Sequence, residues 1–333
     1  MSIPPNLVHT AAGAADGSAQ YRIKRSREVH VHADNLDAWE QRYEQTSHGL
    51  FSGQVRELMD ADIQLFEEEA SCATSQHCQP WDSGVWIGLA VPEAASGLRF
   101  MGRPVDGTQL MLSSNGHPFD LQVPAGCGLY GVVLHQDRVL QHLQQVHHRD
   151  WPQAAHLAPS VQPLNLLQRL RLVGMLREVL RSLEAEPGVL RFDASRHALH
   201  DTLLTVLADT LAPDAVCDAA PPALRRRQDI VDRARELVMA HPEQPPRVEQ
   251  LCVQLHVTRR TLQNCFQDVL GMSPAHYLRT VRLNAVRRAL RTQGTEATIA
   301  DTAARWGFWH MGHFSQDYKA LFGETPSQTR VVG

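Results

Sequence analysis

Four long polar side chains stand at helical spacing in one segment of the chain: Arg259, Arg260, Gln263 and Asn264. At positions i, i+1, i+4 and i+5 they share one side of a helix. Arg can hydrogen-bond guanine, and Asn or Gln can hydrogen-bond adenine, in the major groove of DNA. Thr258, directly before them, is suited to cap the helix, whose N-terminus can then meet a phosphate. Taken alone, four such residues more often form a solvated helical surface.

A second segment repeats this pattern and favours the DNA-binding interpretation. Val248 to Gly271 and Ile299 to Gly323 each contain a short apolar helix, a tight turn, a longer amphipathic helix and a Gly three residues before a Pro. Such an internal duplication predicts two helix-turn-helix units. In the second unit the outward positions are Met311, Gly312, His313, Gln316 and Lys319, and the inward ones are Phe314, Tyr318, Leu321 and Phe322. Pro274 to Arg291 is predicted to form one Arg-rich helix that holds the units at a fixed separation.

The distribution of charge agrees with a polyanionic partner. The chain has 32 Lys and Arg against 36 Asp and Glu, a net charge of -4. Residues 222–333 carry 16 basic and 10 acidic side chains, whereas residues 1–221 carry 16 and 26. We therefore expect a polyanion to meet the basic C-terminal third.

Residues 223–330 resemble the DNA-binding domain of the AraC/XylS family of bacterial transcription regulators. The residues that carry this resemblance are Thr258 to Leu262, Phe266, Leu270, Gly271, Pro274, Tyr277, Arg282, Leu283, Ile299 to Asp301, Gly307, Phe308, Phe314, Phe322, Gly323 and Pro326. The resemblance implies that one helix of each unit enters successive major grooves of double-stranded DNA. Arg260, Gln263, Asn264, His313 and Gln316 are the expected base readers. The resemblance also implies RNA polymerase as a partner.

Two positions depart from the family pattern. Asn264 stands where the family often has Arg, which implies an altered base preference at one step. Trp309 stands where a small polar or acidic residue is common.

The first two thirds of the chain predict a different architecture. Short runs of strand-forming residues separated by Gly, Pro, Asn and Asp extend from Phe51 to about Leu134, which is typical of an antiparallel β sandwich or barrel, here cupin-like. Leucines at helical spacing follow between Leu164 and Leu211; these helices either cover the sheet or form a homodimer surface. The predicted class is α+β. The predicted domains are a loose arm at 1–34, a sensor and dimerisation domain at 35–212, a linker at 213–222 and the double helix-turn-helix domain at 223–333.

The segments GFWH, RRTLQN and RLNAVRR are similar to those of regulators of ethanolamine-utilisation operons within the family. That similarity implies an activator that responds to ethanolamine, with adenosylcobalamin as co-effector. A small ammonium alcohol requires an acidic or aromatic pocket, for which Trp81, Asp82 and Trp86 are the candidates. The corrin-binding D-x-H-x-x-G motif is absent, so the expectation that adenosylcobalamin is a co-effector rests on the resemblance alone. A different small molecule, or a protein partner, remains an alternative.

Catalysis and metal binding are not expected. The chain has no P-loop, G-x-S-x-G or H-E-x-x-H motif. His30 and His32 form an H-x-H pair without the further ligands of a metal-dependent cupin, and Cys72 and Cys78 are too few for a zinc-activated methyl-accepting thiol. A bifunctional enzyme-regulator is therefore the less favoured alternative. No apolar run reaches the length of about 20 residues that spans a membrane, and no leader is recognisable, which predicts a cytoplasmic protein.

Overall fold

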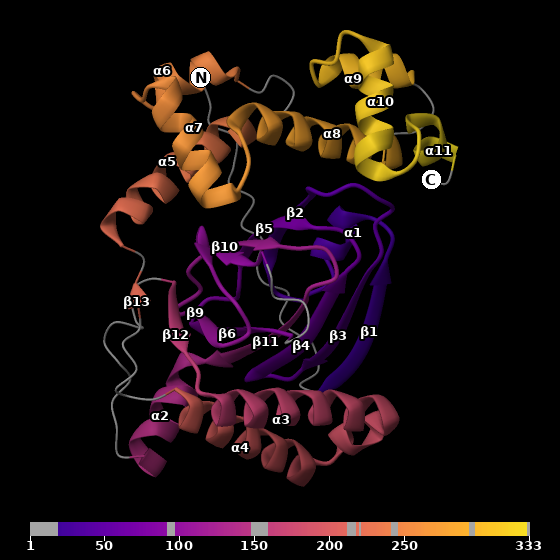
Figure 1. Cartoon of the computed structure of the whole chain (residues 1–333). Helices are drawn as coiled ribbons and strands as arrows, with labels where there is room; N and C mark the ends of the chain where they lie inside the picture. The colour runs from indigo at the N-terminus through magenta and orange to yellow at the C-terminus, as the bar shows by residue number, and fades with distance from the viewer. Residues whose placement is uncertain are drawn as a thin grey trace, which may run out of the picture.

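The computed structural model describes residues 19–91, 97–147, 159–211, 218–219, 221–240, 246–292 and 297–331. Two β-sheets occupy the centre of the molecule, helices α3 and α4 cover them on one side, and the C-terminal helices lie on the other (Figure 1). The predicted combination of N-terminal antiparallel sheets with a helical C-terminal region is confirmed.

The larger sheet has eight described strands in the order β1-β3-β4-β11-β6-β9-β12-β13. Its strands are β1 (Gln20–Ser26), β3 (Gly53–Met59), β4 (Ile63–Ala70), β6 (Gly84–Ala90), β9 (Gln109–Ser113), β11 (Gly128–His135), β12 (Ser160–Pro163) and β13 (Asp218–Ala219). Its pairings are antiparallel; Val132 on β11, for example, lies opposite Leu65 on β4 and Ile87 on β6. Strands β6 and β11 are apolar throughout because both faces of this sheet are covered.

The smaller sheet has five described strands in the order β2-β5-β10-β7-β8. They are β2 (Glu40–Gln45), β5 (Thr74–Gln79), β7 (Arg99–Phe100), β8 (Arg103–Pro104) and β10 (Phe119–Val123). Aromatic side chains fill the space between the two sheets, where the Trp86 and Phe119 rings stack with centroids 4.1 Å apart. This packing makes the N-terminal region a two-sheet sandwich.

A layer of helices covers the outer face of the larger sheet. It consists of α2 (Gln136–His147), α3 (Leu166–Ala185), a 3₁₀ turn (Pro187–Arg191) and α4 (Asp193–Thr210). Leu172, Leu176 and Leu180 of α3 are buried in one apolar cluster with the sheet, as are Leu203 and Leu207 of α4. The leucine-rich helices therefore do cover the sheet, one of the two roles that the sequence left open.

The C-terminal region is helical. Its helices are α5 (Pro222–Ala240), α6 (Val248–Gln254), α7 (Arg259–Leu270), α8 (Pro274–Thr292), α9 (Ile299–Arg305), α10 (Met311–Phe322) and α11 (Pro326–Val331). One apolar cluster joins α5, α6, α7 and the first half of α8. Another joins the second half of α8 to α9 and α10. Helix α8 runs through both and connects them (Figure 1).

The expectation of a loose arm at 1–34 is wrong for the part of it that the structure describes. Residues Gln20–Ser26 form β1, an edge strand paired with β3 along its whole length, and Val29–Ala33 form the short helix α1. Little apolar periodicity marks β1, because its Arg22 and Lys24 side chains pair with Asp37 rather than enter a core. Most of the predicted linker at 213–222, and residues 1–18 of the arm, lie outside the described residues.

Candidate nucleic-acid interface

The first helix pair consists of α6 and α7. The Thr258 hydroxyl accepts a hydrogen bond from the Thr261 backbone N–H at 3.1 Å, which confirms the predicted cap. Gly271 ends α7 in the left-handed conformation at φ +71°, which glycine adopts without strain. The inner side of α7 is buried through Leu262, Phe266 and their neighbours, so only its opposite side can meet a partner.

The polar residues predicted on that opposite side are all exposed: Thr258, Arg259, Arg260, Gln263 and Asn264. Arg259 lies 3.8 Å from Glu249 of α6, measured from Nη1 to Oε1. At this distance and exposure the pair is weak, and the guanidinium can exchange it for a phosphate. The side chains of Arg260, Gln263 and Asn264 form no hydrogen bond or ion pair with a described residue.

The second pair, α9 and α10, is built in the same way. The backbone N–H of His313 donates to Nδ1 of His310 at 3.2 Å and caps α10. Gly323 closes the helix at φ +72°. His313, Gln316 and Lys319 are exposed, as predicted, together with Gly312, while Met311 is half-buried against the apolar cluster of this pair.

Trp309 is an exposed apolar side chain at this surface that the predicted reading set did not include. It is 88% exposed and directly precedes the cap of α10. Its indole contacts the ring of His310 edge-on, with the centroids 5.6 Å apart. The sequence feature that pointed to Trp309 is that a small polar or acidic residue is common at this position in the family.

Helix α8 sets the distance between the two pairs. Its 19 residues correspond to a length of about 28 Å. Tyr277 and Val281 belong to the core of the first pair, and Val286 and Leu290 belong to the core of the second. Because one helix carries both cores, the two exposed reading faces have a fixed relative position.

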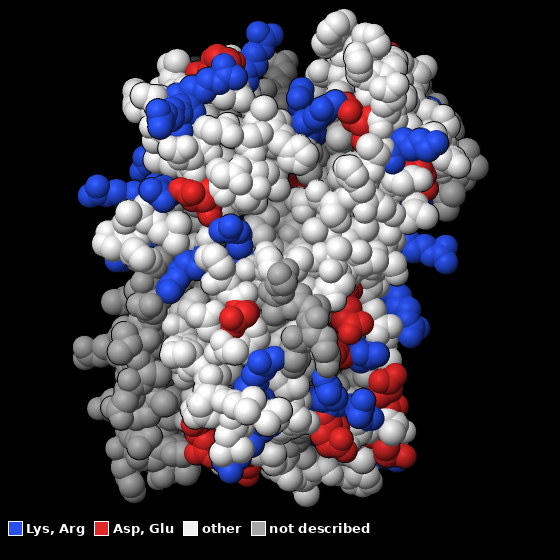
Figure 2. Space-filling model, viewed as in Figure 1, with Lys and Arg blue, Asp and Glu red and all other residues white. Residues whose placement is uncertain are grey.

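Basic side chains gather around the first pair. Figure 2 shows Lys and Arg atoms concentrated over α5, α6 and α7 in the upper left of the molecule. The exposed ones on α5 and α7 are Arg225, Arg226, Arg227, Arg233, Arg259 and Arg260. Such a surface attracts a phosphate backbone irrespective of sequence.

Comparison with known proteins agrees with this geometry. A family model described as a helix-turn-helix domain matches residues 251–331. A probable AraC-family transcriptional regulator of solved structure from Rhodopseudomonas palustris is 32% identical, and the match covers 31% of this chain and 96% of that one, with a TM-score of 0.29. A transcriptional regulator with an AraC-type DNA-binding domain from Chromobacterium violaceum is 30% identical over 94% of its chain and 32% of this one, with a TM-score of 0.30. In its C-terminal region the chain is a helix-turn-helix protein similar to AraC-family transcription regulators.

The chain spans about half the length of the curated relatives that it matches. The probable thc operon regulatory protein of Rhodococcus erythropolis is 32% identical over 139 residues, which is 39% of this chain and 42% of that protein. The transcriptional activator RhaR of Klebsiella pneumoniae is 31% identical over 154 residues, 46% of this chain and 53% of that one. The names of these relatives describe regulators of transcription, which agrees with the prediction that the chain is not an enzyme.

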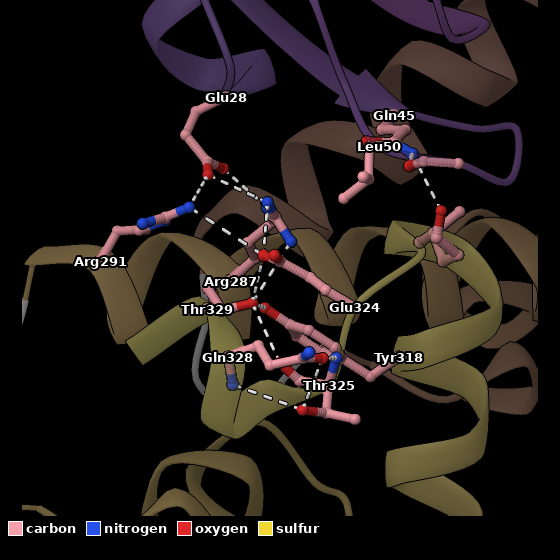
Figure 3. A network of polar contacts seen from close by, with 12 residues as sticks. Glu28, Gln45, Leu50, Arg287, Arg291, Tyr318, Glu324, Thr325, Gln328 and Thr329 are labelled. Carbon is pink, nitrogen blue, oxygen red and sulfur yellow. Dashed lines mark hydrogen bonds and ion pairs between the residues drawn. The ribbon is translucent and has the colours of Figure 1, made fainter. Parts of the chain in front are cut away.

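The inner side of α8 docks on the two-sheet region. Glu28, which precedes α1, accepts hydrogen bonds from Arg287 and lies 2.5 Å from Nη2 of Arg291 (Figure 3). Glu324, before α11, is 3.0 Å from Arg287. Asn284 of α8 donates to the backbone oxygen of Gln45 and accepts from its N–H, both at 3.1 Å. These arginines of α8 therefore bind the N-terminal region and are not available to DNA.

The candidate effector residues occupy separate environments. Trp86 is 2% exposed between the sheets, and the cavity that it lines has a volume of about 10 Å³, which leaves room for at most one water. Trp81 stacks on His135 with centroids 5.6 Å apart, and Asp82 is exposed. None of the described cavities is lined by all three residues. Their effector role stays a prediction.

The remaining predictions concern metals and membranes. Across the residues that the structure describes, no three His, Cys, Asp or Glu side chains are grouped as metal ligands would be. His32 is buried with Nε2 3.0 Å from Oε1 of Glu68, so this half of the H-x-H pair has a structural partner. No described helix combines the length and the apolar character needed to cross a membrane.

Proposed function

We propose that the chain is an effector-responsive activator of transcription that binds its operator through two helix-turn-helix units, α6–α7 and α9–α10. The observation that carries this proposal is the repetition of a capped, outward-facing polar helix on the two ends of one rigid helix, α8. Two such helices on one support suit successive major grooves on one side of a duplex.

The reading residues divide between two tasks. Arg259, Lys319 and the helix N-terminus at Thr258 are placed for phosphates, which supply affinity without sequence choice. We assign the base edges to Arg260, Gln263 and Asn264 on α7 and to His313 and Gln316 on α10, whose side chains are exposed and can hydrogen-bond bases. Met311 and Gly312 at the start of α10 allow close approach to the duplex.

Band-shift titrations against a panel of single-base operator variants test this assignment. Gln263→Ala and Gln316→Ala should each lose about 1–3 kcal/mol of binding free energy at one base step and little elsewhere. Gln267→Ala is the matched control, because Gln267, one turn further along α7, lines a hollow with Arg99 and Leu224 next to the two-sheet region. Uniform weakening across the panel would assign Gln263 and Gln316 to phosphate contacts instead.

We also propose that the two-sheet region is a cupin-like sensor and that the chain acts as a homodimer with RNA polymerase as a further partner. The support for a dimer is an uncovered apolar strip on α3. Leu166, Leu167 and Leu170 are 70%, 57% and 61% exposed, although leucine is ordinarily a buried residue.

For the effector we propose ethanolamine, with adenosylcobalamin as co-effector, on the sequence similarity of GFWH, RRTLQN and RLNAVRR. Isothermal titration calorimetry with ethanolamine, in the presence and absence of adenosylcobalamin and with serine as control, tests it. Binding heat that appears only with another small molecule would reject ethanolamine as the effector, and so would operator binding that neither compound changes. The chain would then be a DNA-binding regulator with a different effector or a protein partner.

A further inference from the structure

A cavity of about 220 Å³ lies between the two-sheet region and the C-terminal helices. Strands β2 and β5 contribute Arg42, Glu44, Ser75 and His77 to its lining, and α5 and α8 contribute Asp232, Arg235, Glu236, Met239 and Tyr277. A molecule bound there would touch both regions at once. Its volume suits a small ligand rather than a drug-sized one.

Ion pairs already occupy most of the charged groups around this cavity. Asp120 of β10 pairs with Arg235 and lies 2.9 Å from Nδ1 of His77. Glu44 receives two guanidinium groups, from Arg42 at 3.1 Å and from Arg288 at 3.3 Å. The positive charges at the cavity are therefore already neutralised, which leaves no site for an anion.

Two further carboxylates remain on one turn of α5. Asp232 is 3.7 Å from Nη1 of Arg235, and Glu236 forms no ion pair with any described residue. With Asp232 and Glu236 included, the cavity and its immediate surroundings hold four carboxylates and three guanidinium groups. The carboxylates are Glu44, Asp120, Asp232 and Glu236, and the guanidinium groups are those of Arg42, Arg235 and Arg288. The ionised cavity thus carries one negative charge in excess.

A proton on Asp232 relieves this excess near neutral pH. Burial raises the pKa of Asp232 to about 7, and the neighbouring Asp120 acts in the same direction, against the smaller opposing effects of Arg235 and His77. A cation bound in the cavity would take the place of that proton. The other ionisable groups around Asp232 are Glu44, Glu236, Arg42, Arg288 and Tyr277.

An aromatic ring and a thioether form the apolar part of the lining. Tyr277 is 6% exposed, yet its hydroxyl has no hydrogen-bond partner among the described residues. Its ring lies 6.0 Å from the guanidinium carbon of Arg235, so its face already attracts one cation. Together with Met239 it offers apolar surface to the carbon atoms of a charged ligand.

We propose that this cavity binds a small organic ammonium ion, with Asp232 and Glu236 facing its charge and Tyr277 and Met239 facing its carbon atoms. This inference rests on the proposed effector-responsive function. It locates the effector in the cavity and not at Trp81, Asp82 and Trp86. Because α5 and α8 also form the core of the first helix pair, a ligand at this site links the two-sheet region directly to the DNA-reading helices.

Isothermal titration calorimetry of the full chain with choline chloride and with ethanolamine hydrochloride at pH 7 tests the site. At least one of the two should bind the unaltered chain and the Asp229→Asn variant, whose substituted residue is exposed on the same helix outside the cavity. Glu236→Gln, an exposed and fold-neutral change, should weaken binding at least tenfold, and so should Asp232→Asn. Binding to the unaltered chain should release protons, measured as a dependence of the heat on the ionisation enthalpy of the buffer.

Two results would overturn the proposal: no binding of either compound to the unaltered chain, or binding by Glu236→Gln and Asp232→Asn as tight as that of the unaltered chain. Loss of binding in Trp81→Phe alone would also overturn it, because the ligand would then lie near the sheet residues. Band shifts of operator DNA without added ligand distinguish a failure of the cavity proposal from a failure of the proposed regulator function. Intact operator binding without ammonium binding rejects the cavity only, whereas absent operator binding rejects the proposed function.

Discussion

Arg287 and Glu28 form a two-point ion pair between α8 and the turn that precedes α1. The Nε–Oε2 distance is 2.6 Å and the Nη2–Oε1 distance is 2.9 Å (Figure 3). Arg291 and Glu324 complete a balanced group of two cations and two anions. Because α8 carries both reading pairs, this group fixes their orientation relative to the two-sheet region.

Glu28→Gln should therefore destabilise the folded chain. It leaves the buried guanidinium group of Arg287 and the half-buried one of Arg291 with one carboxylate, and breaking a buried pair typically costs about 3–5 kcal/mol. Urea unfolding measures the loss. Glu178→Gln, an exposed change on α3, is the control and should stay within about 0.5 kcal/mol of the unaltered chain. An equally small effect of Glu28→Gln would show that the ion pair contributes nothing to the docking of α8.

The reading helices could be predicted from sequence because their signals are local. The cap at Thr258, the buried positions Leu262 and Phe266 and the closing Gly271 all lie within 14 residues of one another. The period of 3.6 residues then places Arg260 and Gln263 outward without knowledge of any other element.

The docking of α8 could not be predicted in this way. Glu28 is 259 residues from Arg287, and the arginine pattern of α8 is equally typical of a DNA-facing helix. The strand β1 was missed for a related reason, since its stability depends on pairing with β3 and on charged partners rather than on an apolar alternation. The cavity at Asp232 joins four elements from both regions, and sequence spacing carries no information about such a meeting.

The structure decides between two roles for Arg282 of α8, a contact within the protein or a contact with DNA. Its guanidinium lies 5.1 Å from the centroid of the Phe308 ring, and Nε donates to the Leu278 backbone oxygen at 3.2 Å. Asp301 of α9 does not pair with Arg282; its carboxylate accepts a hydrogen bond from the hydroxyl of Thr298. Arg282 is therefore a packing residue of the second helix pair.

Arg282→Ala should lower the free energy of unfolding by about 0.5–2 kcal/mol, because the contact of the guanidinium with the Phe308 ring is lost. The salt dependence of operator binding should not change, because no phosphate contact is lost. Arg260→Ala provides the opposite control and should leave stability unchanged while altering DNA binding. A stable Arg282→Ala variant with a flattened salt slope would place this guanidinium on the DNA.

The raised pKa of Asp232 predicts a dependence of stability on pH. Between the unfolded pKa of about 4 and the folded pKa of about 7, the folded chain retains a proton that the unfolded chain releases, so the free energy of unfolding falls as pH rises. Asp232→Asn should remove this fall and stabilise the chain at pH 8. Urea midpoints between pH 4 and pH 8 measure it, with Asp229→Asn as control. A parallel decline in both variants would assign the effect to another group.

The exposed leucines of α3 predict how a dimer would respond to charge. Leu170→Glu places a carboxylate in the middle of the strip that Leu166 and Leu167 flank, so dimers formed there should dissociate because the charge would be buried without a partner. Sedimentation velocity of the full chain should then show a monomer. Val253→Glu is the matched control, since Val253 is 72% exposed on α6, far from α3 in the fold. If Leu170→Glu sediments like the unaltered dimer, the strip on α3 is not the interface; if the unaltered chain is itself a monomer at high concentration, pairing requires DNA or does not occur.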